Sequence, residues 1–186
     1  MAGFGDHKKT QKKIKKNLKN NYFKEQIIHN AFKFHSEGNI SEAIKYYKSF
    51  INKGFEDKRV FSNYGLLLIR LGKLKEAEFF TPKALELNPK LADAYSNLGL
   101  ILRDLGKLKE AELSILRAIK LNPNLAFAYF NISTLKYSNK NKKWQETLFS
   151  KNFLDNKSKK DQVNIYFARA NILHNEKKIP RKFKMP

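Results

Sequence analysis

Two consecutive stretches of this sequence, KRVFSNYGLLLIRLGKLKEAEFFTPKALELNPKL (residues 58–91) and ADAYSNLGLILRDLGKLKEAELSILRAIKLNPNL (residues 92–125), are close copies of each other. The period is 34 residues, and the same spacing separates Gly38, Gly72 and Gly106. Self-similarity at this period indicates stacked supersecondary units, each too small to bury its own apolar face. The period therefore predicts a repeat array, an architecture that usually holds other molecules and rarely catalyses.

Each unit is predicted to be a pair of helices joined by a glycine turn. Apolar residues recur at helical spacing in both halves of the unit, and Pro89 and Pro123 end the second helices. Gly65 and Gly99 stand mid-helix, where glycine costs about 1 kcal/mol relative to alanine. We therefore expect a neighbouring helix to come close at both. Pro82 lies inside a second helix, so we expect that helix to kink or to begin late.

The flanking segments depart from this pattern. The Lys-rich N-terminal segment favours a solvated tail, although Ile14, Leu18 and Tyr22 could line one side of a short helix. We divide the chain into a basic disordered tail (1–23), repeats (24–57, 58–91, 92–125 and the start of a fourth, 126–137, together 24–137), a polar loop with a degenerate helix (138–160), a C-terminal helix (161–178) and a disordered tail (179–186).

Charge and composition limit the classes of protein. The formal net charge is +21, which suggests nucleic acid, but only six of the 38 basic residues are Arg, the better reader of bases and phosphates. Cysteine is absent, which excludes disulfides and fits a reducing compartment. No apolar run approaches the roughly 20 residues that span a bilayer, and no secretory signal is present. We expect a cytoplasmic protein without a membrane span.

The repeated units resemble the tetratricopeptide repeat (TPR) family over about residues 24–138. The matching positions are Phe61, Gly65, Gly72, Ala77, Ala84 and Pro89, then Tyr95, Leu98, Gly99, Gly106, Ala111, Ala118 and Pro123. The resemblance implies an all-α TPR solenoid of antiparallel helix pairs, with about three full repeats, a degenerate fourth and a C-terminal capping helix. More loosely, IYFARANILH resembles the N-terminal repeat region of bacterial TPR–sulfotransferase fusions, here without the catalytic domain.

In that family the first helix of each unit lines a concave groove. The resemblance implies these peptide-binding groove residues: Arg59, Asn63, Leu66, Arg70, Asn97, Leu100, Arg103, Phe127, Asn131 and Tyr137. Three of them are asparagines 34 residues apart. An asparagine amide both donates and accepts, so such a ladder could hold an extended peptide by its backbone. The alternative is that these asparagines are structural.

No catalytic motif is apparent. His29 and His35 are six residues apart, which is not a metal-ligand spacing, and neither GxxxxGK[ST] nor GxGxxG occurs. We predict a non-catalytic protein–protein interaction scaffold that needs no cofactor or metal and binds a protein or peptide. The alternatives are a substrate-positioning part of a sulfotransferase-type enzyme and a basic nucleic-acid-binding protein. The apolar stripe of the C-terminal helix leaves a homodimer contact open.

Overall fold

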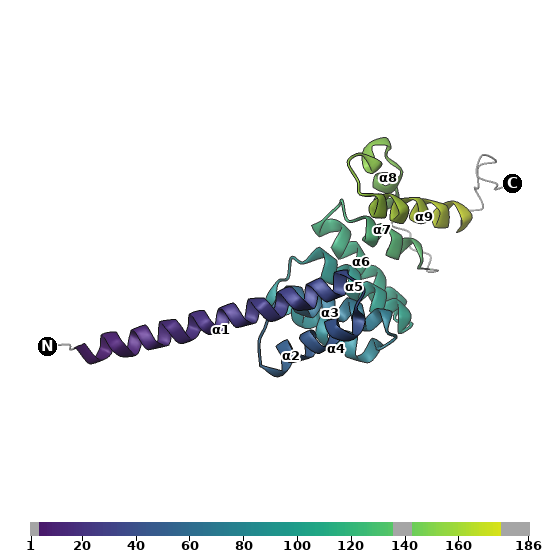
Figure 1. The fold of residues 1–186 in the computed structure, drawn as a ribbon. Coiled ribbons are helices and arrows are strands. Elements are labelled where there is room, and N and C mark those ends of the chain that lie inside the picture. The colour runs from purple at the N-terminus through teal and green to yellow at the C-terminus, as the bar shows by residue number, and fades with distance from the viewer. Residues whose placement is uncertain (1–3, 136–142, 176–186) are drawn as a thin grey trace. The chain divides into compact units, whose positions relative to one another are not determined.

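The computed structural model describes residues 4–135 and 143–175, and every regular element within these ranges is helical (Figure 1). The chain divides into two compact units, Met1–Val60 and Phe61–Pro186. The division falls inside the repeat region that the sequence predicted for residues 24–137.

The first unit is built on a helical hairpin of α1 (Phe4–Ser36) and α2 (Ile40–Asn52). Gly38 makes the turn with φ of 74°, in the left-handed region that glycine adopts without a steric penalty. Tyr47 is fully buried on α2, and its hydroxyl lies 2.9 Å from Nδ1 of His35 on α1. This hydrogen bond joins the two helices, and burial raises the pKa of the Tyr47 phenol.

The N-terminal segment corrects the expected disordered tail over residues 1–23, because α1 already begins at Phe4. The physical reason lies in the composition: lysine and glutamine are good helix formers, and no glycine or proline occurs between Asp6 and Glu37. Figure 1 shows the N-terminal half of α1 running well past α2. The side chains of residues 10–22 are accordingly all exposed.

The second unit continues the helix pairs. Its helices are α3 (Lys58–Arg70, which starts in the first unit), α4 (Leu74–Leu87), α5 (Ala92–Asp104), α6 (Leu108–Leu121), α7 (Ala126–Ser133), α8 (Lys143–Phe149) and α9 (Lys159–Asn175), with a 3₁₀ turn, η1 (Lys151–Leu154), between the last two. Gly72 and Gly106 make the turns into α4 and α6, with φ of 71° and 78°. The predicted glycine turns are confirmed.

The mid-helix glycines mark close helix contacts, as expected. A Cβ atom added to Gly99 on α5 would collide with the side chain of Ile115 on α6, and would lie 3.0 Å from the carbonyl oxygen of Ala111. A Cβ added to Gly65 on α3 would collide with the hydroxyl of Thr81 on α4. Each glycine therefore lets two helices of a pair approach more closely than any other residue would allow.

Helix α4 runs through Pro82 without a break, from Leu74 to Leu87. The expectation of a late start at Pro82 is therefore wrong. The preceding residue, Thr81, is fully buried, and its hydroxyl has no hydrogen-bond partner among the described residues. The equivalent residue one 34-residue repeat later, on α6, is the apolar Ile115. Helix α4 therefore buries a hydroxyl without a hydrogen-bond partner in the described structure, at a position where α6 has an apolar side chain.

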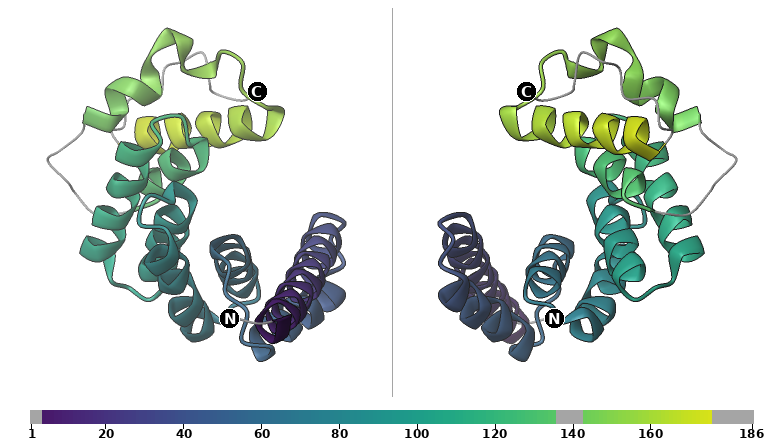
Figure 2. Two further views of the ribbon diagram at one scale, coloured as in Figure 1. Left: turned by 90° about the vertical axis from the view of Figure 1, so that its left-hand side faces the viewer. Right: turned by 90° about the vertical axis from the view of Figure 1, so that its right-hand side faces the viewer.

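The C-terminal elements α7, α8, η1 and α9 pack around one apolar core at the end of the second unit. Its buried members are Ala126, Tyr129, Leu148, Phe153, Ile165, Ala168 and Ile172. Helix α9 lies beside α7 (Figure 2). Phe130 contacts Phe167, and Ser133 accepts a hydrogen bond from Asn171. From the first contact to the second, the residue numbers increase in both helices. Helices α7 and α9 therefore run parallel, as the first helices of successive 34-residue repeats do.

Candidate functional site

Helices α5, α7 and α9 of the second unit form one continuous face. Between α5 and α7, Asn131 bonds to Ser96 and Arg103 bonds to Thr134. Between α7 and α9, the rings of Phe130 and Phe167 meet. We call this side of α5, α7 and α9, with the equivalent positions of α3, the groove face.

Asn131 is a structural member of the groove face. It is 1% exposed, and its Nδ2 donates to Ser96 at 3.0 Å from Oγ and 3.3 Å from the backbone oxygen. Its Oδ1 is buried and has no hydrogen-bond partner in the described part of the chain. The amide nitrogen of Asn131 therefore already joins α5 and α7, the first helices of two neighbouring 34-residue repeats.

The other two asparagines differ from Asn131. Ser62 and Asn97 occupy the equivalent positions one 34-residue repeat earlier. No hydrogen bond of the described structure joins their side chains. Asn97 is 5% exposed, and Asn63 on α3 is half-buried. The expected ladder therefore splits, because Asn131 is committed internally whereas the amides of Asn63 and Asn97 are not.

Two of the three predicted groove arginines are engaged by neighbouring side chains. Arg103 donates from Nε to Asp104 and from Nη1 to Thr134, both at 2.8 Å. Arg59 belongs to the first unit and meets carboxylates of Asp57 and Glu25 at 2.7 and 3.4 Å. Arg70, at the end of α3, is exposed.

The Asp57–Arg59 pair fixes the start of α3. Oδ1 of Asp57 accepts from the backbone N–H of Arg59 at 2.8 Å, in the manner of an N-cap. Burial opposes ionisation of Asp57, but the hydrogen bonds and charge of Arg59 outweigh it, so the pKa of Asp57 lies below its ordinary value. The hydrogen bonds that the Arg59 guanidinium donates to Asp57 raise the pKa of Arg59. Arg59 is thus part of a local ion-pair network.

The apolar part of the groove face gathers at α7 and α9. Leu66 and Leu100 are half-buried on α3 and α5. Phe127 and Phe130 are half-buried on α7, with ring centroids 6.4 Å apart. Phe167 on α9 is 58% exposed and meets Phe130 edge-on at 6.5 Å.

The sequence analysis did not include Phe167 among the predicted groove residues. It stands in the apolar stripe of the C-terminal helix, for which the sequence left two roles open, a cap that packs on the fourth repeat and a homodimer contact. Only the parallel pairing of α9 with α7 places its ring beside Phe130. The predicted groove residue Tyr137 lies outside the described residues.

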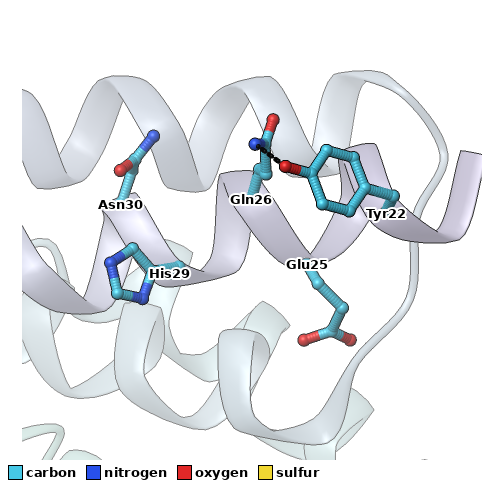
Figure 3. Close-up of a pocket in the computed structure, with 5 residues that line it drawn as sticks. All are labelled: Tyr22, Glu25, Gln26, His29 and Asn30. Atoms are coloured by element: carbon cyan, nitrogen blue, oxygen red, sulfur yellow. Dashed lines mark hydrogen bonds between the residues drawn. The ribbon is translucent and has the colours of Figure 1, made fainter. Parts of the chain in front are cut away.

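A pocket of about 360 Å³ lies along α1 of the first unit (Figure 3). Its described lining residues are Tyr22, Glu25, Gln26, His29 and Asn30. Gln26 donates to the Tyr22 hydroxyl at 2.8 Å, while Glu25 points away from this pair. All five of these residues belong to the single helix α1.

Within residues 4–135 and 143–175, no group of three His, Cys, Asp or Glu side chains is placed to hold a metal ion. No helix of these residues is long and apolar enough to cross a membrane.

Comparison with known proteins identifies the repeats. Residues 59–91 and 92–125 each match a family model described as tetratricopeptide repeat. No curated protein matches the sequence. The sequence is thus similar to the tetratricopeptide repeat over residues 59–125.

Solved structures support the same fold. The first TPR of Spaghetti (RPAP3), bound to the HSP90 peptide SRMEEVD, is 26% identical with a TM-score of 0.56, over 60% of this chain and 89% of that one. YrrB, described as a TPR protein with an unusual peptide-binding site, is 22% identical (TM-score 0.60; 81% and 73% covered). MamA is 20% identical (TM-score 0.56; 95% and 99% covered). The all-helical chain therefore resembles TPR solenoids.

Proposed function

We propose that this chain is a non-catalytic interaction scaffold that binds a peptide segment on the groove face of its second unit. The observation that carries the proposal is the cluster of Phe127, Phe130 and Phe167, in which the Phe130 ring meets the other two while Phe167 remains largely exposed. Aromatic side chains that meet at a surface are a common anchor for apolar ligand side chains. The first TPR of RPAP3, which was solved with a bound HSP90 peptide, supports this use of the fold.

The remaining groove residues take different parts in the proposal. The amides of Asn63 and Asn97 pair with the peptide backbone, since an amide matches both its donor and its acceptor. Leu66 and Leu100 contact its apolar side chains, and Arg70 attracts its negative charge. Tyr137 extends the set beyond the described residues. Arg103, Asn131 and Arg59 shape the protein rather than contact the peptide, because each already has partners.

The test is selection of peptides from a random displayed library on the intact chain, followed by titration calorimetry. Phe167→Ala should weaken the selected peptides about tenfold, because an exposed aromatic anchor is lost. Asn97→Ala should weaken them about fivefold, the value of one net hydrogen bond. Leu113→Ala is the matched control, since Leu113 is 68% exposed on the second helix α6. Affinities that ignore Phe167→Ala and Asn97→Ala would refute the proposed site.

Other readings of the chain make different predictions. Self-association through α9 is one, because Val163 and Tyr166 are also exposed on that helix, at 50% and 56%. It predicts a mass by light scattering that doubles with concentration and returns to the monomer value in Tyr166→Asp.

The sulfotransferase-type reading predicts a coding sequence for the catalytic domain directly downstream of this one in the gene.

A further inference from the structure

The N-terminal half of α1 carries a strong charge of one sign. Residues 7–24 contain eight lysines and no aspartate or glutamate. Among residues 10–22 every side chain is exposed, so these charges are not neutralised by burial against the rest of the chain. A helix that is basic along three turns attracts a negatively charged partner.

The same stretch exposes apolar side chains on one side. Ile14, Leu18 and Tyr22 follow one another at intervals of four residues and are 52%, 64% and 67% exposed. On a helix of 3.6 residues per turn they form a single stripe along the axis. Large exposed apolar groups in a row indicate a contact surface.

Charge and apolar stripe are separated around the helix. Counting about 100° per residue from Ile14, Leu18 and Tyr22 fall within about 80°. Lys12, Lys13, Lys15, Lys16 and Lys19 occupy an arc of about 160° on the other side. The arc between them carries uncharged Asn17 and Asn21. This is a basic amphipathic helix, although its apolar stripe is narrow.

We propose that this half of α1 binds the surface of an anionic lipid bilayer, lying parallel to it. The lysines then approach the anionic headgroups while Ile14, Leu18 and Tyr22 enter the boundary between headgroups and acyl chains. Lysine stems are long enough to reach the headgroups from a helix that lies in this boundary. The site consists of residues of α1 alone and shares none with the groove face, so it does not depend on the proposed peptide binding.

The exposed stripe favours a bilayer over nucleic acid. Binding to a phosphate backbone uses the charges alone and gains nothing from Ile14 and Leu18. The segment also contains no Arg, the side chain best suited to bidentate phosphate contacts, and lysine suffices for a diffuse anionic surface. A partner that is anionic at its surface and apolar beneath it explains both the exposed apolar stripe and the lysine-only charge.

The test is co-sedimentation of the intact chain with large vesicles of phosphatidylcholine, with or without 30 mol% (about a third) phosphatidylserine, at several salt concentrations. Binding should require phosphatidylserine and weaken as salt screens the charges. The double change Lys12→Glu, Lys16→Glu should reduce affinity at least about 25-fold, at about fivefold for each lysine lost. Lys109→Glu with Lys120→Glu, two exposed lysines of the second unit, is the control of equal charge.

The apolar stripe gives the decisive arm. Leu18→Asp should reduce vesicle affinity at least about tenfold, whereas Leu113→Asp, the exposed control on α6, should change it only about as much as one added negative charge does. Leu18→Asn separates the apolar loss from the charge and should still weaken binding severalfold. Helical content by circular dichroism should be unchanged in all variants. Binding to a 20-mer RNA that exceeds vesicle binding and ignores Leu18→Asn would overturn the proposal, as would equal binding to both kinds of vesicle.

Discussion

Nδ2 of Asn131 lies 3.0 Å from the hydroxyl oxygen of Ser96, and this hydrogen bond joins α5 and α7, the first helices of two successive 34-residue repeats. Both residues are fully or almost fully buried. The equivalent residues one unit earlier, Ser62 and Asn97, have no such bond in the described structure. A strict sequence repeat therefore does not produce a strict repeat of contacts.

Asn131→Ala should destabilise the protein by about 1–3 kcal/mol, because it leaves the buried Ser96 without this partner and opens a small cavity. Asn97→Ala should cost clearly less. Urea denaturation in the absence of any peptide measures both. Equal losses for the two variants would show that the internal hydrogen bond does not distinguish them.

Gly99→Ala should destabilise despite the better helix propensity of alanine. The gain of about 1 kcal/mol in propensity is opposed by overpacking against Ile115 and the Ala111 carbonyl, which typically costs about 1–3 kcal/mol. A double-mutant cycle with Ile115→Ala is the control. The penalty should shrink when Ile115 is truncated, and a penalty that stays the same in both backgrounds would contradict the close contact.

Pro82→Leu should stabilise the protein by up to about 3 kcal/mol, because proline removes a hydrogen bond from the helix interior and crowds the preceding turn. The equivalent residue of the next unit is Leu116. Thermal melting should therefore shift upward. Pro89→Leu, which lies just after α4, is the control and should change the stability by no more than about 1 kcal/mol. A lower melting temperature for Pro82→Leu would mean that α4 needs the proline.

The stability contributed by Asp57 should depend on pH. Its folded pKa is below the ordinary value, since the hydrogen bonds and charge of Arg59 outweigh burial. The contribution is therefore present above the ordinary aspartate pKa of about 4. It is lost as the pH falls further, through the lowered folded pKa. The difference in unfolding free energy between wild type and Asp57→Asn should shrink over this range. A difference that stays constant down to about pH 2 would exclude the ionised pair as its source.

The sequence by itself determined the helix pairs, the glycine turns and the close contacts at Gly65 and Gly99. These features are local. Helical periodicity, a left-handed turn residue and a missing Cβ act within one unit of 34 residues, so the repeat encodes them directly. The same reasoning did not predict that α1 would extend back to Phe4, because it weighed lysine-rich composition above the helix propensity of lysine.

The tertiary structure alone decided which of the predicted groove residues contact neighbouring side chains. Asn63, Asn97 and Asn131 stand 34 residues apart in the sequence, yet only Asn131 finds a serine of the neighbouring first helix, Ser96, within hydrogen-bonding distance. Arg59 is engaged by Glu25 of α1, and Phe167 reaches Phe130 through the pairing of α9 with α7. Each of these contacts joins side chains of different helices. Their distances depend on how neighbouring helices pack and on which rotamers that packing allows, and residue spacing along the chain does not encode either.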